Sequence, residues 1–174
     1  MFAILLIMTS FISIGCGNTY KTQLINIPGY VLEYRWNIEF ENLWLKDDDR
    51  EEIIGLYQEV WDNIVYRDSL LIAEKYREWM WINAFVQDNL NILEDQWLTL
   101  SNVKKTQIWI INGQELKNAV LLEYEITQWF IEEIPVLYMA QLFIPDGEGV
   151  ILVSFSSEEL SSRNAASNMF KNIK

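Results

Sequence analysis

Between residues 31 and 65 the pattern of hydrophobic and polar positions changes. It alternates at first, and further along the apolar positions recur at helical spacing. Over residues 31–40, Leu32, Tyr34 and Trp36 alternate with polar side chains, which predicts a strand with one buried face. After three aspartates at 47–49, apolar residues recur along one helix face, which predicts a helix from about residue 49 to 65. The aspartates are interpreted as helix caps, because the alternating ligands, central glycine and closing glutamate of a calcium loop are absent.

Residues 69–88 contain two nearly continuous apolar runs, at 70–73 and 79–86, separated by mostly charged residues. One long helix would accommodate both runs, but its second half would be apolar on every side. A hairpin of two strands is therefore favoured, with the second strand buried on both faces. Leu90, Leu93, Trp97 and Leu100 then mark a second short helix.

The rest of the chain predicts further strands and a closing helix. The strands span residues 107–111, 120–126, 136–144 and 150–155, and the turn sequences Asn112-Gly113 and Pro145-Asp146-Gly147 end two of them. Ser156 and Glu159 have the spacing of a helix capping box, and the helix that follows has an apolar face formed by Ala166, Met169, Phe170 and Ile173. Strands followed by helices that pack on one face of the sheet predict an α+β class with an antiparallel sheet.

Several of these segments resemble the PsbP-like fold, which includes the photosystem II subunit PsbP, a Ran-binding nuclear import factor and bacterial envelope proteins such as DcrB. The segments that carry the resemblance are residues 81–86, Asn118-Ala119-Val120 with Tyr124, residues 150–156 and residues 169–173. The resemblance extends from about residue 70 to residue 174. It implies a two-layer architecture and a non-catalytic role in interaction or assembly, and no functional residue is carried over.

An uncharged apolar run, residues 2–14, ends at Gly15-Cys16. It is shorter than the roughly 20 residues that a spanning helix needs, and a small residue precedes the cysteine as in a signal cleavage site. Residues 13–16 resemble the bacterial lipobox, which implies cleavage between Gly15 and Cys16 and a lipid on the Cys16 thiol. We therefore expect a signal peptide at 1–15, a lipidated tether at 16–28 and a single α+β domain at 29–174. The alternative is a buried first element with Cys16 as an ordinary core thiol.

The composition argues against several partners. With 25 acidic and 13 basic residues, a net charge of −12 and no long basic run, the chain does not fit a nucleic-acid partner and would be repelled by anionic lipid. Acyl chains would therefore have to hold the protein at the membrane. A single cysteine permits no disulfide within the chain, so an aromatic-rich core must stabilise the domain. Solubility is the simplest account of the acidity.

Few residues could carry catalysis. The chain has no histidine, which excludes Ser/His and Cys/His machinery and ordinary zinc sites, and its glycines form no nucleotide-binding motif. Glu123 and Glu125 share a strand face and could pair as in glycoside hydrolysis, but carboxylates on an outward strand face are usually solvated. Ser101 with Lys104 as its base is a weaker candidate. We expect no catalytic residue, no metal and no cofactor.

Several aromatic residues could instead form an exposed surface for sugar or protein recognition, although filling the core is the better account of their size. They are Trp79, Trp81 and Trp129, with Phe130 and Ile131 after the last. The sequence as a whole predicts a non-catalytic lipoprotein of the bacterial cell envelope, with its domain outside the cytoplasm, that binds another protein or stabilises an assembly. The alternatives are an immunity-type or inhibitor protein that neutralises a basic partner, and a carboxylate-dependent hydrolase.

Overall fold

The computed structural model describes most of the chain from residue 21 onward. The described residues are 21–27, 29–36, 39–42, 53–61, 64–76, 81–95, 98–113, 115–127, 136–147 and 149–174; of residues 21, 36, 39–42, 53–61 and 64–68 only the backbone is described. The signal and lipid-attachment predictions at Gly15 and Cys16, and the predicted caps at 47–49, lie outside these ranges.

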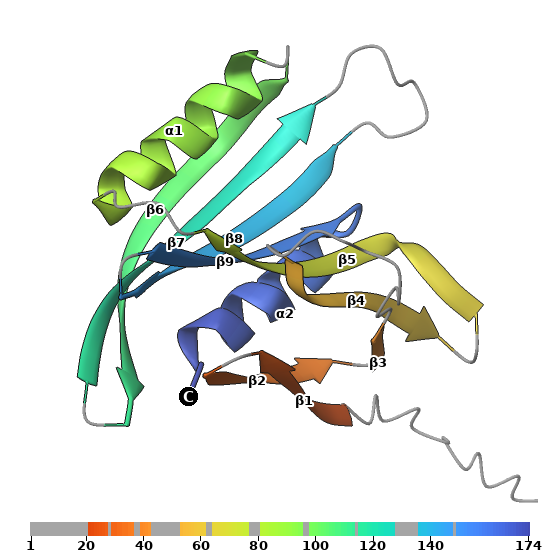
Figure 1. The fold of residues 1–174 in the computed structure, drawn as a ribbon. Coiled ribbons are helices and arrows are strands. Elements are labelled where there is room, and N and C mark those ends of the chain that lie inside the picture. Colours follow the sequence, from red (N-terminus) through yellow and green to blue (C-terminus); the bar gives the residue numbers. More distant parts are fainter. Residues whose placement is uncertain are drawn as a thin grey trace, which may run out of the picture.

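A seven-stranded antiparallel sheet forms the centre of the fold (Figure 1). Its strands lie in the order β3 (Glu39–Asn42), β4 (Ile53–Trp61), β5 (Ile64–Tyr76), β9 (Gly149–Ser157), β8 (Leu137–Asp146), β7 (Glu115–Thr127) and β6 (Thr99–Asn112). Strands β1 (Lys21–Ile27) and β2 (Tyr30–Trp36) form a separate hairpin, and the helices are α1 (Ile82–Asp95) and α2 (Leu160–Lys171). The predicted α+β class with an antiparallel sheet is confirmed.

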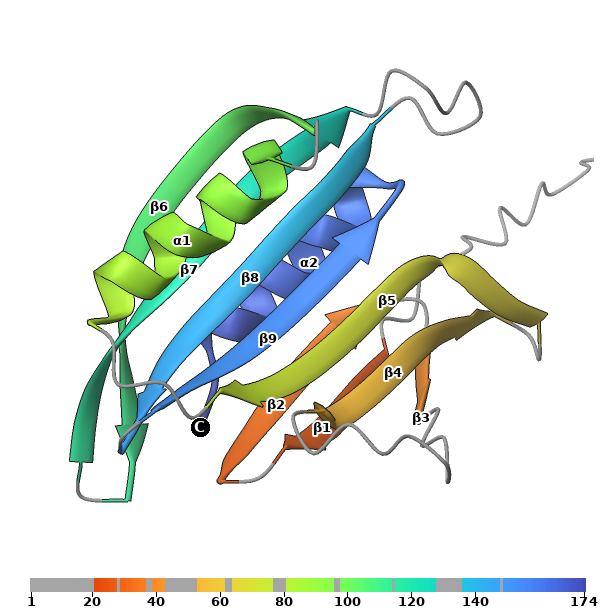
Figure 2. The same ribbon diagram turned by 45° about the horizontal axis from the view of Figure 1, so that its top comes forward.

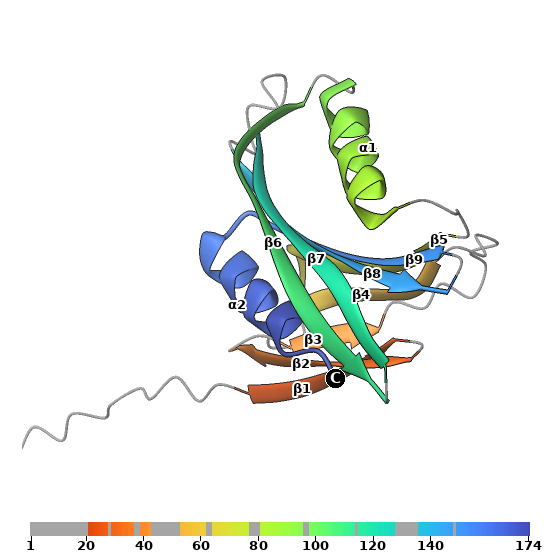
Figure 3. The same ribbon diagram turned by 90° about the vertical axis from the view of Figure 1, so that its left-hand side faces the viewer.

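The two helices cover opposite faces of the sheet, whereas the sequence led us to expect both on one face (Figures 2 and 3). α1 lies over β6, β7 and β8, while α2 lies on the other face beside the β1–β2 hairpin. Successive residues of a strand point to opposite faces. On β7, Leu121 packs in the cluster that contains α2, and Leu122 packs in the cluster that contains α1. The continuous apolar runs of the central strands therefore require cover on both faces.

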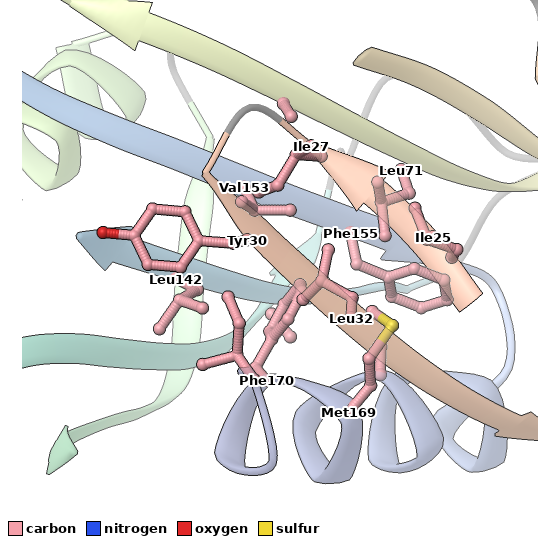
Figure 4. Packing of buried hydrophobic residues seen from close by; sticks show 14 of the residues in the cluster. Ile25, Ile27, Tyr30, Leu32, Leu71, Leu142, Val153, Phe155, Met169 and Phe170 are labelled. Carbon is pink, nitrogen blue, oxygen red and sulfur yellow. The ribbon is translucent and has the colours of Figure 1, made fainter. Parts of the chain in front are cut away.

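The larger core cluster lies between the sheet, α2 and the β1–β2 hairpin (Figure 4). Leu32 from β2, Phe155 from β9 and Phe170 from α2 meet there with no exposed surface. The predicted apolar face of the closing helix is confirmed, because its four residues all belong to this cluster: Ala166, Met169, Phe170 and Ile173. The hairpin is thus an integral part of the core.

The start of the folded region differs from our expectation. Residues 21–27, which we expected to belong to the tether, form β1, and its Ile25 and Ile27 are buried in the main core. The segment expected as one strand over residues 31–40 forms two strands, β2 and β3, which belong to different sheets. Within β2 the predicted alternation is confirmed, because Leu32 and Tyr34 are buried and their polar neighbours are exposed. In residues 21–27 only Ile25 and Ile27 alternate with a polar residue, and the adjacent Leu24 obscures the pattern.

The helix expected at residues 49–65 is wrong, because β4 occupies most of this segment. β4 pairs with β5 in antiparallel register, with Leu56 opposite Ile72 and Tyr57 opposite Leu71. Its sequence is rich in isoleucine, valine and aromatic residues, which favour strands, and it contains Gly55, which is unfavourable inside a helix. Pairing with the buried strand β5 therefore outweighs the helical spacing of the apolar residues.

The strand expected over residues 79–86 is also wrong, because α1 begins at Ile82 and continues to Asp95. The apolar residues that face the sheet are spaced three or four apart and form one stripe: Ile82, Phe85, Val86, Leu90 and Leu93. Trp81 and Ala84, which made the run look apolar on every side, are exposed. The short helix predicted around Leu90 is therefore the second half of α1, and Leu100 lies in β6.

The four strands predicted in the second half of the chain are confirmed, and each continues past its predicted last residue. The capping box predicted for α2 is not formed. Ser156 lies in β9, and the N-cap residue is Glu159, whose side chain makes no capping hydrogen bond. Instead, the backbone N–H of Glu159 donates to Ser157 Oγ at 3.0 Å, which places the cap acceptor one residue later than predicted.

Candidate functional site

The two carboxylates singled out by the sequence lie on the face of β7 that α2 covers. We expected Glu123 to be solvated, but it is buried, with 5% of its surface exposed. Its carboxylate lies 3.5 Å from Lys104 Nζ on β6 and 3.8 Å from Arg163 Nη1 on α2. Glu125 Oε2 accepts a hydrogen bond of 2.8 Å from Asn102 Nδ2, so both carboxylates already have partners from the protein.

Electrostatics keep Glu123 ionised. Burial acts to raise the pKa of its carboxyl, but the Ser167 hydroxyl and the positive charges of Lys171, Lys104 and Arg163 more than offset burial, so the pKa lies below its ordinary value. A general acid in glycoside hydrolysis requires the opposite shift. The arrangement is that of an ion-pair cluster that joins β6 and β7 to α2, and it does not resemble a pair of catalytic acids.

The serine and lysine of the weaker catalytic candidate are separated by an irregularity in β6. A register shift lies between Ser101 and Lys104, and Asn102 within it has a positive φ of 52°. Lys104 Nζ is directed to Glu123, its ion-pair partner, and Ser101 lies opposite Glu125 on β7. The structure thus places these residues around a β-bulge held by carboxylates.

A second buried polar group lies under α1. Gln141 Oε1 on β8 accepts hydrogen bonds from Asn89 Nδ2 at 2.9 Å and from Tyr124 Oη at 3.0 Å, and Gln141 Nε2 donates to Ser154 Oγ at 3.1 Å. Burial raises the pKa of the Tyr124 hydroxyl, which keeps it protonated as a donor. Each polar atom in this chain of bonds has a partner, so the network fixes the position of α1 on the sheet.

Three of the exposed large apolar side chains of the described residues lie together on the β6–β7 hairpin. Trp109 and Ile111 of β6 and Leu116 of β7 are 63%, 67% and 61% exposed. Ile111 lies directly opposite Leu116, and Trp109 is the next residue of β6 on the same face, so the three side chains are neighbours. Residues 115–119 of β7 extend beyond its pairing with β8, which begins at Val120. We call these three residues the hairpin patch.

The edge strand that carries the patch differs in charge from the rest of the chain. β6 is the last strand of the sheet, and its sequence contains Lys104 and Lys105 but no acidic residue, in a chain of net charge −12. Lysines and a β-bulge commonly protect an edge strand from pairing with other chains. In β6 the lysines and the β-bulge both lie in the first half of the strand. The second half, which carries Trp109 and Ile111, has neither.

The inner face of the hairpin is fixed to the core. Lys117 Nζ lies 3.4 Å from Asp146 Oδ1 on β8 and 5.7 Å from the centre of the Tyr30 ring on β2. Asp146 Oδ2 also lies 2.8 Å from Lys75 Nζ, and this hydrogen bond is the main reason why the pKa of Asp146 is lowered. The β1–β2 turn comes close to the hairpin tip (Figure 3), since a Cβ added at Gly29 would lie 3.7 Å from Asn112 Nδ2. The patch is therefore presented on a firmly supported hairpin.

Of the five aromatic and aliphatic residues that the sequence suggested as a recognition surface, one lies within the described ranges. Trp81 is 83% exposed, so the expectation that it fills the core is wrong, while Trp79, Trp129, Phe130 and Ile131 lie outside the described ranges. Within those ranges, neither helix has the length and apolarity needed to cross a bilayer, and acidic and thiol side chains form no group of three that could hold a metal ion.

Sequence reasoning predicted the strand that contains Trp109 and Ile111 but did not identify them as a surface. The available signal was the alternation of Gln107, Trp109 and Ile111 with Ile108 and Ile110, which shows that both faces of this segment carry large side chains. Only the fold shows which face is left uncovered.

Comparisons with known proteins support the fold alone. No family model matches the chain, and no curated protein matches it. Among solved structures, the fold is similar to that of PA94, a protein of unknown function from Pseudomonas aeruginosa, with a TM-score of 0.50 and 16% sequence identity over 87% of this chain and 94% of that chain. At this identity the similarity concerns architecture and does not extend to function.

Proposed function

We propose that this protein is a non-catalytic, lipid-anchored protein of the bacterial envelope that binds another protein through the hairpin patch and so stabilises an assembly at the membrane. The observation that carries the binding role is the exposure of Trp109, Ile111 and Leu116 on one face of a supported hairpin. Adjoining exposed apolar side chains commonly mark interaction sites, and tryptophan is among the residues that contribute most to binding energy at interfaces.

Charge narrows the class of partner. Lys105 lies on the same face of β6 as Trp109 and Ile111, so a partner with an acidic rim around an apolar centre would complement this surface. A strongly basic partner, as in the inhibitor alternative, would be repelled at this edge. We therefore favour an assembly partner over a neutralised toxin.

The proposed anchor fits this role by geometry. The five residue steps from Cys16 to Lys21, where β1 begins, can span at most about 18 Å. Attachment of lipid to Cys16 would thus keep the folded domain within a short distance of the bilayer. A partner that meets the hairpin patch would itself be at the membrane surface.

The anchor is tested by metabolic labelling of cells with a palmitate analogue. We expect label on the wild-type protein, none on Cys16→Ala, and release of Cys16→Ala from the membrane fraction. Wild-type protein that carries no label would contradict the anchor, whatever the result for binding.

Binding through the patch is tested by placing a photo-crosslinking amino acid at Ile111 in intact cells. The matched control position is Ile92, which is 57% exposed on α1 and lies outside the patch. We expect one dominant crosslinked protein from position 111 that is absent from position 92. The same protein captured equally at both positions, or no specific product at 111, would contradict a role for the patch.

A further inference from the structure

A groove of about 700 Å³ runs between β2 and α2, on a different part of the molecule from the hairpin patch. Its floor is formed by Ala165 and Met169 of α2, and its two walls are β2 at Glu33 and Arg35 and the asparagines of α2. Figure 4 shows β2 crossing in front of the sheet with α2 beside it.

The wall formed by β2 is a strand edge that already accepts one partner. The backbone N–H of Val31 donates to the carbonyl of Lys174 at 2.7 Å, and the N–H of Lys174 donates to the carbonyl of Val31 at 3.1 Å. Alternate residues of a strand direct their N–H and C=O groups to the same edge. Because the register with β1 is regular, those of Glu33 and Arg35 point into the groove, and within the described residues neither has a backbone partner there.

The opposite wall carries amides at a matching interval. Asn164 and Asn168 lie four residues apart on α2, a rise of about 6 Å, and Asn172 is the C-cap residue of the helix. An extended peptide repeats on one side every two residues, about 6.7 Å. Asn172 Nδ2 bonds to the carbonyl of Asn168, but the side chains of Asn164 and Asn168 form no hydrogen bond within the described part of the chain. Each could donate to and accept from a peptide main chain.

We propose that this groove binds an extended peptide segment of a partner protein, which adds as a strand to the edge of β2 beyond the bonds that Val31 makes with Lys174. One edge of the peptide bonds to the backbone of Glu33 and Arg35, and the other edge bonds to Asn164 and Asn168. Recognition is mainly through the peptide main chain, as in other cases of strand addition. The groove is lined by one acidic and two basic residues, Glu33 with Lys174 Nζ at 3.6 Å and Arg35, so it selects a segment without basic side chains.

The test begins with selection from a phage-displayed library of random heptapeptides on the wild-type protein, followed by synthesis of the selected peptides. We expect Asn164→Ala/Asn168→Ala to weaken their binding at least tenfold. The matched control is Asn83→Ala/Asn91→Ala on α1, which leaves affinity unchanged. Substitution of the hairpin patch should also leave the affinity for these peptides unchanged, so a failure of the groove proposal can be told apart from a failure of the proposed function.

Two further measurements test strand addition itself. Arg35→Pro removes the N–H that points into the groove, and Arg35→Ala removes the side chain but keeps that N–H; we expect at least tenfold loss for the first and little for the second, with equal urea midpoints. The peptide is N-methylated either at its odd-numbered or at its even-numbered residues. One of these two sets should abolish binding, and the other should leave binding intact. Failure to select any peptide, equal effects of both Arg35 variants, or no alternation in the N-methyl scan would overturn the proposal.

Discussion

The β1–β2 hairpin provides the sharpest test of the packing, because two leucines on it face opposite ways. Leu32 has no exposed surface and lies in the core with Phe155 and Phe170, whereas Leu24 is 60% exposed on the outer face. Leu32→Ala removes roughly three methylene-sized groups, each worth about 0.8 kcal/mol of transfer free energy. With the cavity that remains, the free energy of unfolding should fall by about 3–4 kcal/mol. Leu24→Ala should change it by less than about 0.5 kcal/mol.

Urea denaturation followed by tryptophan fluorescence measures both variants. With an m-value of about 2 kcal/mol/M, the midpoint should fall by about 1.5–2 M for Leu32→Ala and by less than about 0.3 M for Leu24→Ala. Equal midpoints for the two variants would refute the reasoning, because they would show that Leu32 of β2 does not pack in the core.

Two other predictions concern the buried polar groups. The pKa of Glu123 is lowered from 4.5, so its charge stabilises the fold above the unfolded pKa and this contribution is lost as the pH falls through the folded pKa. Wild-type protein should therefore exceed Glu123→Gln in stability by about 1–3 kcal/mol at pH 7, and the difference in urea midpoint should vanish near pH 3; a difference independent of pH would contradict the ion-pair cluster. Gln141→Leu leaves Asn89, Tyr124 and Ser154 without their partner, so the thermal midpoint should fall by about 6–12 °C, and an unchanged midpoint would show that the network contributes nothing.

The sequence predicted the second half of the fold well because its signals agree with one another there. Turn sequences such as Asn112-Gly113 bound long runs of strand-forming residues, and Gly113 has the positive φ of 61° that such a turn needs. In the first half the signals conflict. The apolar residues of β4 have helical spacing although their types favour strands. In α1 the apolar residues form a narrow stripe, but the exposed Trp81 and Ala84 make the segment look apolar on every side.

The candidate sites depend on contacts between segments that are distant in the sequence. Arg163 lies 40 positions after Glu123, so local alternation could not show that α2 buries this carboxylate. In the same way, Trp109 belongs to a correctly predicted strand, but the sequence could not show that α1 leaves its face uncovered. The pairing of Lys174 with Val31 also arises from the tertiary fold, so nothing local indicates the groove beside it. Periodicity identifies elements, whereas exposure is decided by which elements come to cover them.

The central claim is that the hairpin patch binds a protein partner, and co-purification from solubilised envelopes tests it most directly. The variant Trp109→Ser/Ile111→Ser/Leu116→Ser changes only exposed side chains and should keep the wild-type urea midpoint. We expect the partner that crosslinks at position 111 to co-purify with wild-type protein and with the control Leu24→Ser, and to be reduced at least tenfold with the triple variant. Undiminished recovery of that partner by the stably folded triple variant would contradict the claim.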